Sequence, residues 1–220
     1  MNLPKCLFSS VISGAIAIGF HGSAIASWGN PVRDDLVAQN PNCEAPQTQM
    51  EINICATIYY QTADKKLNQV YQQLSSQMRS QLTDSQLIWI EFRDKNCEFA
   101  RSLFEGGSIA PTIQNGCLGG MSEHRALELE IYQSGQIPQP TSRNYAQIDR
   151  KLNQVYQTFL SQLSAANQNK LQTAELAWIE FRDANCDFEA TQAANGENLC
   201  KIRMTEQRTE ELSQLMDLNP

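Results

Sequence analysis

Apolar side chains recur every three or four residues in six segments of the chain, which is the period of an amphipathic α-helix. The first such segment places Leu67, Val70 and Tyr71 on one stripe, and a later segment does the same with Trp178 and Phe181. No segment shows the strict alternation of apolar and polar residues that is typical of a half-buried strand. The pattern therefore predicts an all-α fold.

The order of the helical segments repeats. Residues 66–72 recur without change as residues 151–157, a second block that begins at Trp89 recurs from Trp178, and a third block follows in the same order in both copies. Three amphipathic helices with short connectors bury their stripes against each other. We therefore expect two tandem modules, each an antiparallel three-helix bundle.

Local signals predict where two helices of the first module begin. Thr83 with Gln86 has the pattern of a capping box, and Leu82 with Leu87 has that of a hydrophobic staple. Both patterns mark the start of a helix, so we expect the second helix to begin near Thr83. A third helix is expected from about Thr112.

A connector with one glycine and two prolines lies between the two copies, and these residues stop a helix and favour an extended chain. The expected organisation is a signal peptide at 1–26, a flexible leader at 27–42, a first module at 43–133, a linker at 134–142, and a second, truncated module at 143–217.

The first segment has the pattern of an export signal. Lys5 precedes an apolar run at 7–20, and three small residues at 24–26 supply a cleavage site. The run is shorter than the roughly 20 apolar residues that a membrane span needs. We expect cleavage near Ala26 and a periplasmic or secreted protein without a stable membrane anchor.

The acidic composition narrows the class of partner. The formal charge is −7, and loss of Lys5 with the signal peptide makes it −8. Nucleic acids and anionic membranes would repel such a surface, whereas a cationic protein would be attracted. The alternative is that the acidity only keeps an exported protein soluble.

Six cysteines follow residue 26, and an even number in an exported chain indicates disulfides. The second module has no counterpart for Cys43 or Cys55, and this paired absence predicts that these two bind each other. If Cys43 and Cys55 instead paired with Cys97 and Cys117, the two cysteines of the second module would lack the partners that their counterparts have. The remaining four cysteines are therefore expected to pair within their own modules. The expected bonds are Cys43 with Cys55, Cys97 with Cys117, and Cys186 with Cys200.

The sequence offers few parts for catalysis, metal binding or a cofactor. No C-x-x-C pair occurs, and His124 is the only histidine after residue 26. Glu91 and Asp94 lie three residues apart on one helix, whereas the two acids of a glycosidase flank the substrate from opposite sides. We expect neither an enzyme nor a protein with a cofactor.

Two arginines of the first module recur at matching positions of the second, on or beside the apolar stripes. An arginine there needs a carboxylate partner, so we expect buried or half-buried structural pairs; a recognition surface is the functional alternative. The expected polar network comprises Asp64, Asn68, Arg93, Asp94, Arg125, Asp149, Asn153, Arg182, Asp183 and Arg208.

One connector in the first module differs from its counterpart in the second. Residues 106–112 combine a flexible glycine turn with an apolar tip, and they are either a simple helix connector or a presented binding loop. The candidate contact residues are Gly106, Gly107, Ser108, Ile109 and Pro111.

Taken in order, the motifs of the first module resemble a known family. They are Cys43, the Gln-Thr-Gln-Met run at 47–50, Cys55, Asp64-x-x-Leu-Asn-x-x-Tyr71, Trp89-x-x-Phe-Arg-Asp-x-x-Cys97, Gly-Gly-Ser at 106–108, Cys117 and Arg125. This combination is similar to the LprI-like lysozyme inhibitor N-terminal domain family, also called domain of unknown function 1311. The second module resembles a truncated member.

The resemblance implies a helical, disulfide-bonded domain in the bacterial envelope or outside the cell, with lysozyme inhibition in some members. We therefore expect an exported binding protein that inhibits a basic lysozyme-type muramidase through the first module. The alternative function is a structural or adaptor protein of the envelope without inhibitory activity.

Overall fold

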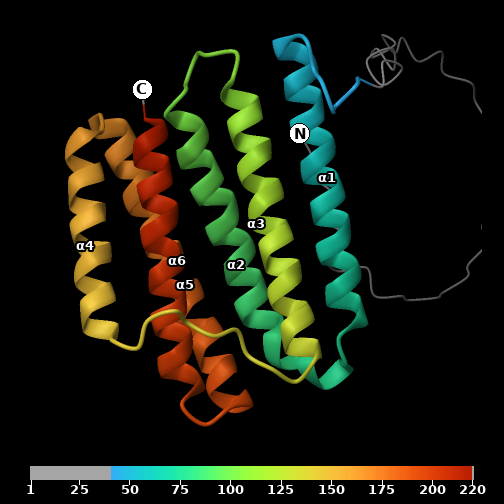
Figure 1. Cartoon of the computed structure of the whole chain (residues 1–220), viewed down its shortest axis with the longest axis vertical. Coiled ribbons are helices and arrows are strands. Elements are labelled where there is room, and N and C mark those ends of the chain that lie inside the picture. The colour runs from blue at the N-terminus through green and yellow to red at the C-terminus, as the bar shows by residue number, and fades with distance from the viewer. Residues whose placement is uncertain (1–40, 220) are drawn as a thin grey trace, which may run out of the picture.

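The computed structural model describes residues 41–219, which form six α-helices and no strand (Figure 1). The helices are α1 (Gln49–Gln73), α2 (Ser76–Ser102), α3 (Ala110–Gln133), α4 (Tyr145–Gln162), α5 (Ala165–Gln192) and α6 (Gly196–Leu218). The predicted all-α fold of two tandem helical modules is confirmed. The expected signal peptide and nearly all of the expected leader lie outside the described residues.

Hydroxyl side chains cap the starts of α1 and α2. The Thr48 hydroxyl accepts the backbone N–H of Glu51, and the Glu51 carboxylate accepts that of Thr48, which is a capping box. Ser75 caps α2 by accepting the N–H of Met78.

The predicted start of α2 near Thr83 is wrong, because the helix begins seven residues earlier, at Ser76. Thr83 lies within the helix, and its hydroxyl donates to the carbonyl of Arg79, 2.7 Å away. A threonine inside a helix can satisfy its hydroxyl on the preceding turn, so the sequence pattern of a cap occurs here without a helix end.

The helices pack in an order that differs from their order in the chain. In the first module α3 packs against both α1 and α2, and in the second module α6 packs against both α4 and α5. The modules meet where α2 packs along α5. Figure 1 shows α1 and α3 on one side and α4 on the other, with α2 and α6 between them and α5 behind α6.

The two modules share one hydrophobic core. The core runs through residues of both, from Leu67 and Trp89 in the first module to Trp178 and Leu212 in the second. The reason is that α2 and α5 are apolar on more than one side, so each buries one face inside its module and another against its counterpart.

Three disulfides fasten the helices: Cys43–Cys55, Cys97–Cys117 and Cys186–Cys200. The last two join α2 to α3 and α5 to α6. The first ties the segment before α1 back onto that helix. None of the helices in residues 41–219 is long and apolar enough to cross a bilayer.

Candidate functional site

The junction of the two modules is built from repeat-equivalent residues. Arg125 of α3 donates from Nη1 to Oδ1 of Asn185 on α5, at 2.8 Å. Its counterpart Arg208 of α6 donates from Nη1 to Oδ1 of Asn96 on α2, also at 2.8 Å. Each module therefore supplies a hydrogen-bond acceptor for the other's buried arginine. Both guanidinium groups are at most 1% exposed, so these contacts hold the modules together and do not form an accessible site.

The other expected polar residues form smaller groups. Arg93 pairs with Asp64 at 3.2 Å and with Asp94 at 2.9 Å, and Asn68 donates to Asp64 at 3.0 Å. The guanidinium of Arg93 lies 5.1 Å from the centre of the Trp89 ring, a cation–π distance.

The second module arranges the equivalent residues differently. Arg182 pairs with Asp183 at 2.8 Å and lies over the Trp178 ring, while Asp149 accepts a bond from Asn153. The ten residues of the expected network thus occupy several separate contacts.

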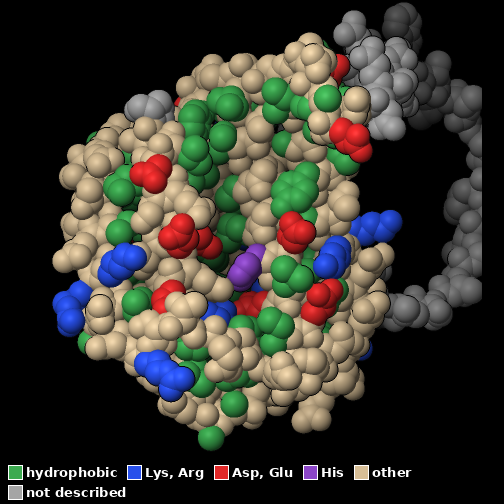
Figure 2. Space-filling view, viewed as in Figure 1, with side chains coloured by type: hydrophobic (Ala, Val, Ile, Leu, Met, Phe, Trp, Pro, Cys, Tyr) green, Lys and Arg blue, Asp and Glu red, His purple; other side chains and the backbone are tan. Residues whose placement is uncertain are grey.

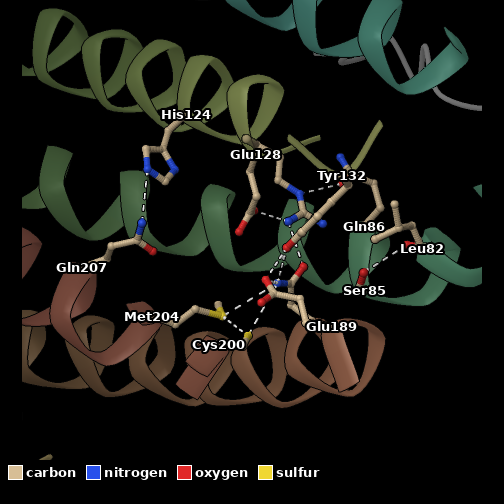
Figure 3. A network of polar contacts seen from close by, with 12 residues as sticks. Leu82, Ser85, Gln86, His124, Glu128, Tyr132, Glu189, Cys200, Met204 and Gln207 are labelled. Carbon is tan, nitrogen blue, oxygen red and sulfur yellow. Dashed lines mark hydrogen bonds and ion pairs between the residues drawn. The ribbon is translucent and has the colours of Figure 1, made fainter. Parts of the chain in front are cut away.

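A buried charge cluster that the sequence analysis missed lies beside the junction. Arg203 of α6 pairs with Glu128 of α3 at 2.8 Å and also with Glu189 of α5. The Tyr132 hydroxyl donates to Glu189 at 2.5 Å. Figure 3 shows Glu128 and Tyr132 on α3 pointing towards Glu189 on α5. Three helices from two modules therefore converge on one buried cluster.

The pKa values of the two carboxylates in this cluster are shifted in opposite directions. Burial alone would raise the pKa of Glu128, but the charges of Arg125 and Arg203 outweigh it and lower the pKa to about 2. For Glu189 burial dominates and raises the pKa, although Arg203 acts in the opposite direction. Glu128 is therefore the firmly ionised partner of Arg203.

The cluster could have been found by comparing the two modules for differences. Arg203 stands where the first module has Gly120, and Glu189 stands where it has Ala100. A charged residue at a position that is small in the other copy signals a contact that only one copy makes.

An open groove lies between α3 and α6, with α2 and α5 as its floor. We call it the α3–α6 groove; its volume is about 590 Å³, and its walls come from residues 112–128 and 204–218. Figure 2 shows this hollow on the face of the molecule, with apolar side chains inside and acidic side chains on both sides. The side chains of His124 and Gln207, 3.3 Å apart, bridge its two walls.

The predicted loop forms part of a second exposed feature. Asn53 of α1 donates to the carbonyl of Ser108 at 3.2 Å and accepts from the Thr112 hydroxyl at 2.5 Å. These bonds join the loop to the start of α1. We call the joined segments, residues 42–53 and 104–112, the first-module tip.

The first-module tip presents apolar and acidic groups together. Met50 is 63% exposed and Ile109 is 39% exposed. Glu44 and Glu105, in the same two segments, are exposed, and neither segment of the tip contains Lys or Arg. Gly106, Gly107, Ser108 and Pro111 are exposed as well.

The second module has no equivalent of this tip. The helix α4 has 18 residues against 25 in α1, and α5 connects to α6 through the short turn of Ala193, Ala194 and Asn195. Among residues 41–219, no group of three or more His, Cys, Asp and Glu side chains could hold a metal ion.

Comparison with known proteins shows similarity to one family, one curated protein and a solved structure. The family model described as "Lysozyme inhibitor LprI" matches twice, at residues 41–129 and 133–212. An uncharacterised protein of Rhizobium meliloti (strain 1021) is 32% identical over 107 residues, which cover 41% of this chain and 77% of that protein. The crystal structure of an uncharacterised protein from Burkholderia thailandensis has the same fold, with a TM-score of 0.61 at 16% identity, covering 86% of this chain and 98% of that one.

Proposed function

The chain belongs to the family of the lysozyme inhibitor LprI, and from this premise we propose that it is an exported protein that binds and inhibits lysozyme-type muramidases. The observation that carries the proposal is the family match to both modules. Inhibition by such a protein is a protein–protein binding event and needs no catalytic residue. The three disulfides support an oxidising compartment, outside the cytoplasm, as the place of action.

The first-module tip is the proposed contact surface. Its exposed Met50 and Ile109 are apolar anchors of the kind that supply binding energy at the centre of an interface. Its acids, Glu44 and Glu105, complement a basic enzyme and would speed the encounter at low salt. The hydrogen bonds of Asn53 hold the loop to α1, which reduces the entropy lost on binding.

The test is a cell-wall lysis assay with a basic lysozyme and the full oxidised chain in excess. We expect slower lysis in the presence of the chain, with weaker inhibition as salt rises, because exposed charges are screened within about 8 Å at physiological ionic strength. Unchanged lysis rates with several basic lysozymes at low salt would reject the inhibitor function. An envelope adaptor would then be the better explanation of the two modules.

Paired variants test the tip separately. Replacing Glu44 and Glu105 by Gln should weaken inhibition several-fold, and Met50→Ser with Ile109→Ser should weaken it about tenfold or more. Glu180→Gln with Asp187→Asn removes the same charge from exposed positions of α5 and serves as the control. Inhibition that is equal in the tip and control variants would show that the enzyme binds elsewhere on the chain.

A further inference from the structure

The α3–α6 groove exists because the two modules differ at three equivalent positions. On one side of the junction, Arg203, Glu189 and Tyr132 fill the space between α3 and α6 with buried side chains. On the other side their counterparts are Gly120, Ala100 and Leu215. These smaller or wholly apolar residues leave the equivalent space open, and all three line the groove.

The groove has the length and lining of a helix-binding site. The stretch of α3 from Thr112 to the bridge between His124 and Gln207 covers about 18 Å at 1.5 Å per residue. Its floor is aromatic, with Trp89, Phe92, Trp178 and Phe181. A Cβ added at Gly116 would have no neighbour within 4 Å, so this wall lets another backbone approach closely.

The charges of the groove favour a cationic occupant. The two arginines of its lining, Arg125 and Arg208, are buried and paired with carboxylates. Glu211 on the α6 wall is one of these carboxylates, 2.9 Å from Arg208, and its side chain is nevertheless 41% exposed. Next to it Glu210 accepts a hydrogen bond from Gln214, another residue of the lining. Helix α3 contributes no Lys or Arg other than Arg125.

We propose that the α3–α6 groove binds a basic amphipathic helix of another polypeptide. Apolar side chains at positions i, i+3 or i+4, and i+7 of that helix would enter the groove over the tryptophans, and its lysines or arginines would lie beside Glu210 and Glu211. The site is separate from the first-module tip, so the proposal does not depend on lysozyme inhibition.

The probe is a labelled 16-residue peptide of Leu and Lys arranged at helical spacing, added to the oxidised chain in a Trp28→Phe background. Only Trp89 and Trp178 then remain, and both line the groove. We expect one-to-one binding, a change in tryptophan emission and a gain of helical circular dichroism. A peptide of the same composition in scrambled order should bind at least tenfold more weakly.

Two variants test the place of binding. Gly116→Leu with Gly120→Leu fills the groove while improving helix propensity, and should weaken binding at least tenfold. Ala146→Leu with Ala166→Leu adds the same side chains at exposed positions of α4 and α5 and should leave binding unchanged. Gln214→Lys at the groove should weaken binding about threefold, whereas Gln157→Lys on α4 should not.

The proposal is overturned if the unmodified groove does not bind the amphipathic peptide, or if the scrambled peptide binds equally well. It also fails if the groove variants bind as tightly as their controls. Should the double leucine variant not fold, the pair of lysine variants still decides the matter, because each changes one solvent-accessible polar side chain.

Discussion

The rings of Phe92 and Phe181 stack with their centroids 5.9 Å apart and their planes inclined by 13°. The two residues hold the same position in the two modules, so the stack lies where α2 and α5 meet. Arg208 lies over the first ring and Arg125 over the second, each with its guanidinium carbon 5.2 Å from the ring centre. The junction therefore combines apolar, cation–π and hydrogen-bonded contacts in a two-fold pattern.

Removing one acceptor of the junction should destabilise the whole chain. Asn185→Ala removes two hydrogen bonds: the one that buried Arg125 donates to the Asn185 side chain, and the one that Asn185 donates to the hydroxyl of Tyr132. Arg125 keeps its bonds to Glu128 and Gln86, but one buried N–H of its guanidinium loses its acceptor. Such a loss costs about 1 to 3 kcal/mol, and we expect the free energy of unfolding in urea to fall by about that amount. The control Asn153→Ala removes an exposed amide that bonds only Asp149 in the structure and should cost less than about 0.5 kcal/mol. Equal losses in the two variants would contradict this account of the junction.

Acid should weaken the fold through Glu128. The folded-state pKa of about 2 lies below the ordinary 4.5, so the stability that this carboxylate contributes is present above pH 4.5 and is lost as the pH falls towards 2. The shift corresponds to roughly 3 kcal/mol. Glu128→Gln should therefore be about that much less stable than the natural chain at pH 7, and the two should converge near pH 2. The raised pKa of Glu189 acts in the opposite direction, and the variant makes that shift smaller, because the charge of Glu128 contributes to it.

Urea unfolding at several pH values provides the measurement. A stability difference between the Gln variant and the natural chain that stays constant from pH 7 to pH 2 would contradict the paired, ionised state of Glu128.

The disulfides should differ in how readily a reductant reaches them. Cys43 is exposed, whereas Cys186 and Cys200 have no exposed surface. Under native conditions dithiothreitol should therefore reduce Cys43–Cys55 first and Cys186–Cys200 only on unfolding. Alkylation of the freed thiols at timed intervals, followed by peptide mass spectrometry, measures the order. Early labelling of Cys186 would show that α5 and α6 separate more easily than their burial indicates.

Two glycines in helices should respond to alanine in opposite ways. A Cβ at Gly196 would lie 2.1 Å from the carbonyl oxygen of Glu189, which belongs to the backbone of α5 and has little room to move. Gly196→Ala should cost about 2 kcal/mol or more, as overpacking does. Gly116→Ala meets nothing within 4 Å and should gain about 0.5 to 1 kcal/mol from helix propensity. Melting temperatures of the two variants that shift in the same direction would refute the predicted contrast.

The periodic stripes and the repeat were enough to predict the helices and the two modules, and the ordered motifs of the first module resemble the family whose model matches the chain. The cysteine pairs followed from the absence of two cysteines in the second module. These features are local or are copied between modules, so a single sequence contains them.

Contacts that exist in only one module, or between modules, were not predicted. An apolar stripe on α2 indicates burial but does not say that α5 covers it. Arg203 and Glu189 are conspicuous only when the two modules are compared for differences. The groove depends on the absence of large side chains at Gly120 and Ala100. The cap at Thr83 was misread because the same residue pattern is compatible with a helix interior.

The reciprocal bonds of Arg125 with Asn185 and of Arg208 with Asn96 describe an isologous interface, the kind that two identical subunits form in a two-fold dimer. A chain with a single copy of this module would bury its aromatic face and satisfy its arginine only by meeting a second copy of itself. In the present chain the linker makes that meeting intramolecular, and so independent of protein concentration. Joined in one chain, the two halves need not be identical: the second carries Arg203 and Glu189, and the first carries Gly120 and Ala100, the small residues that leave the groove open.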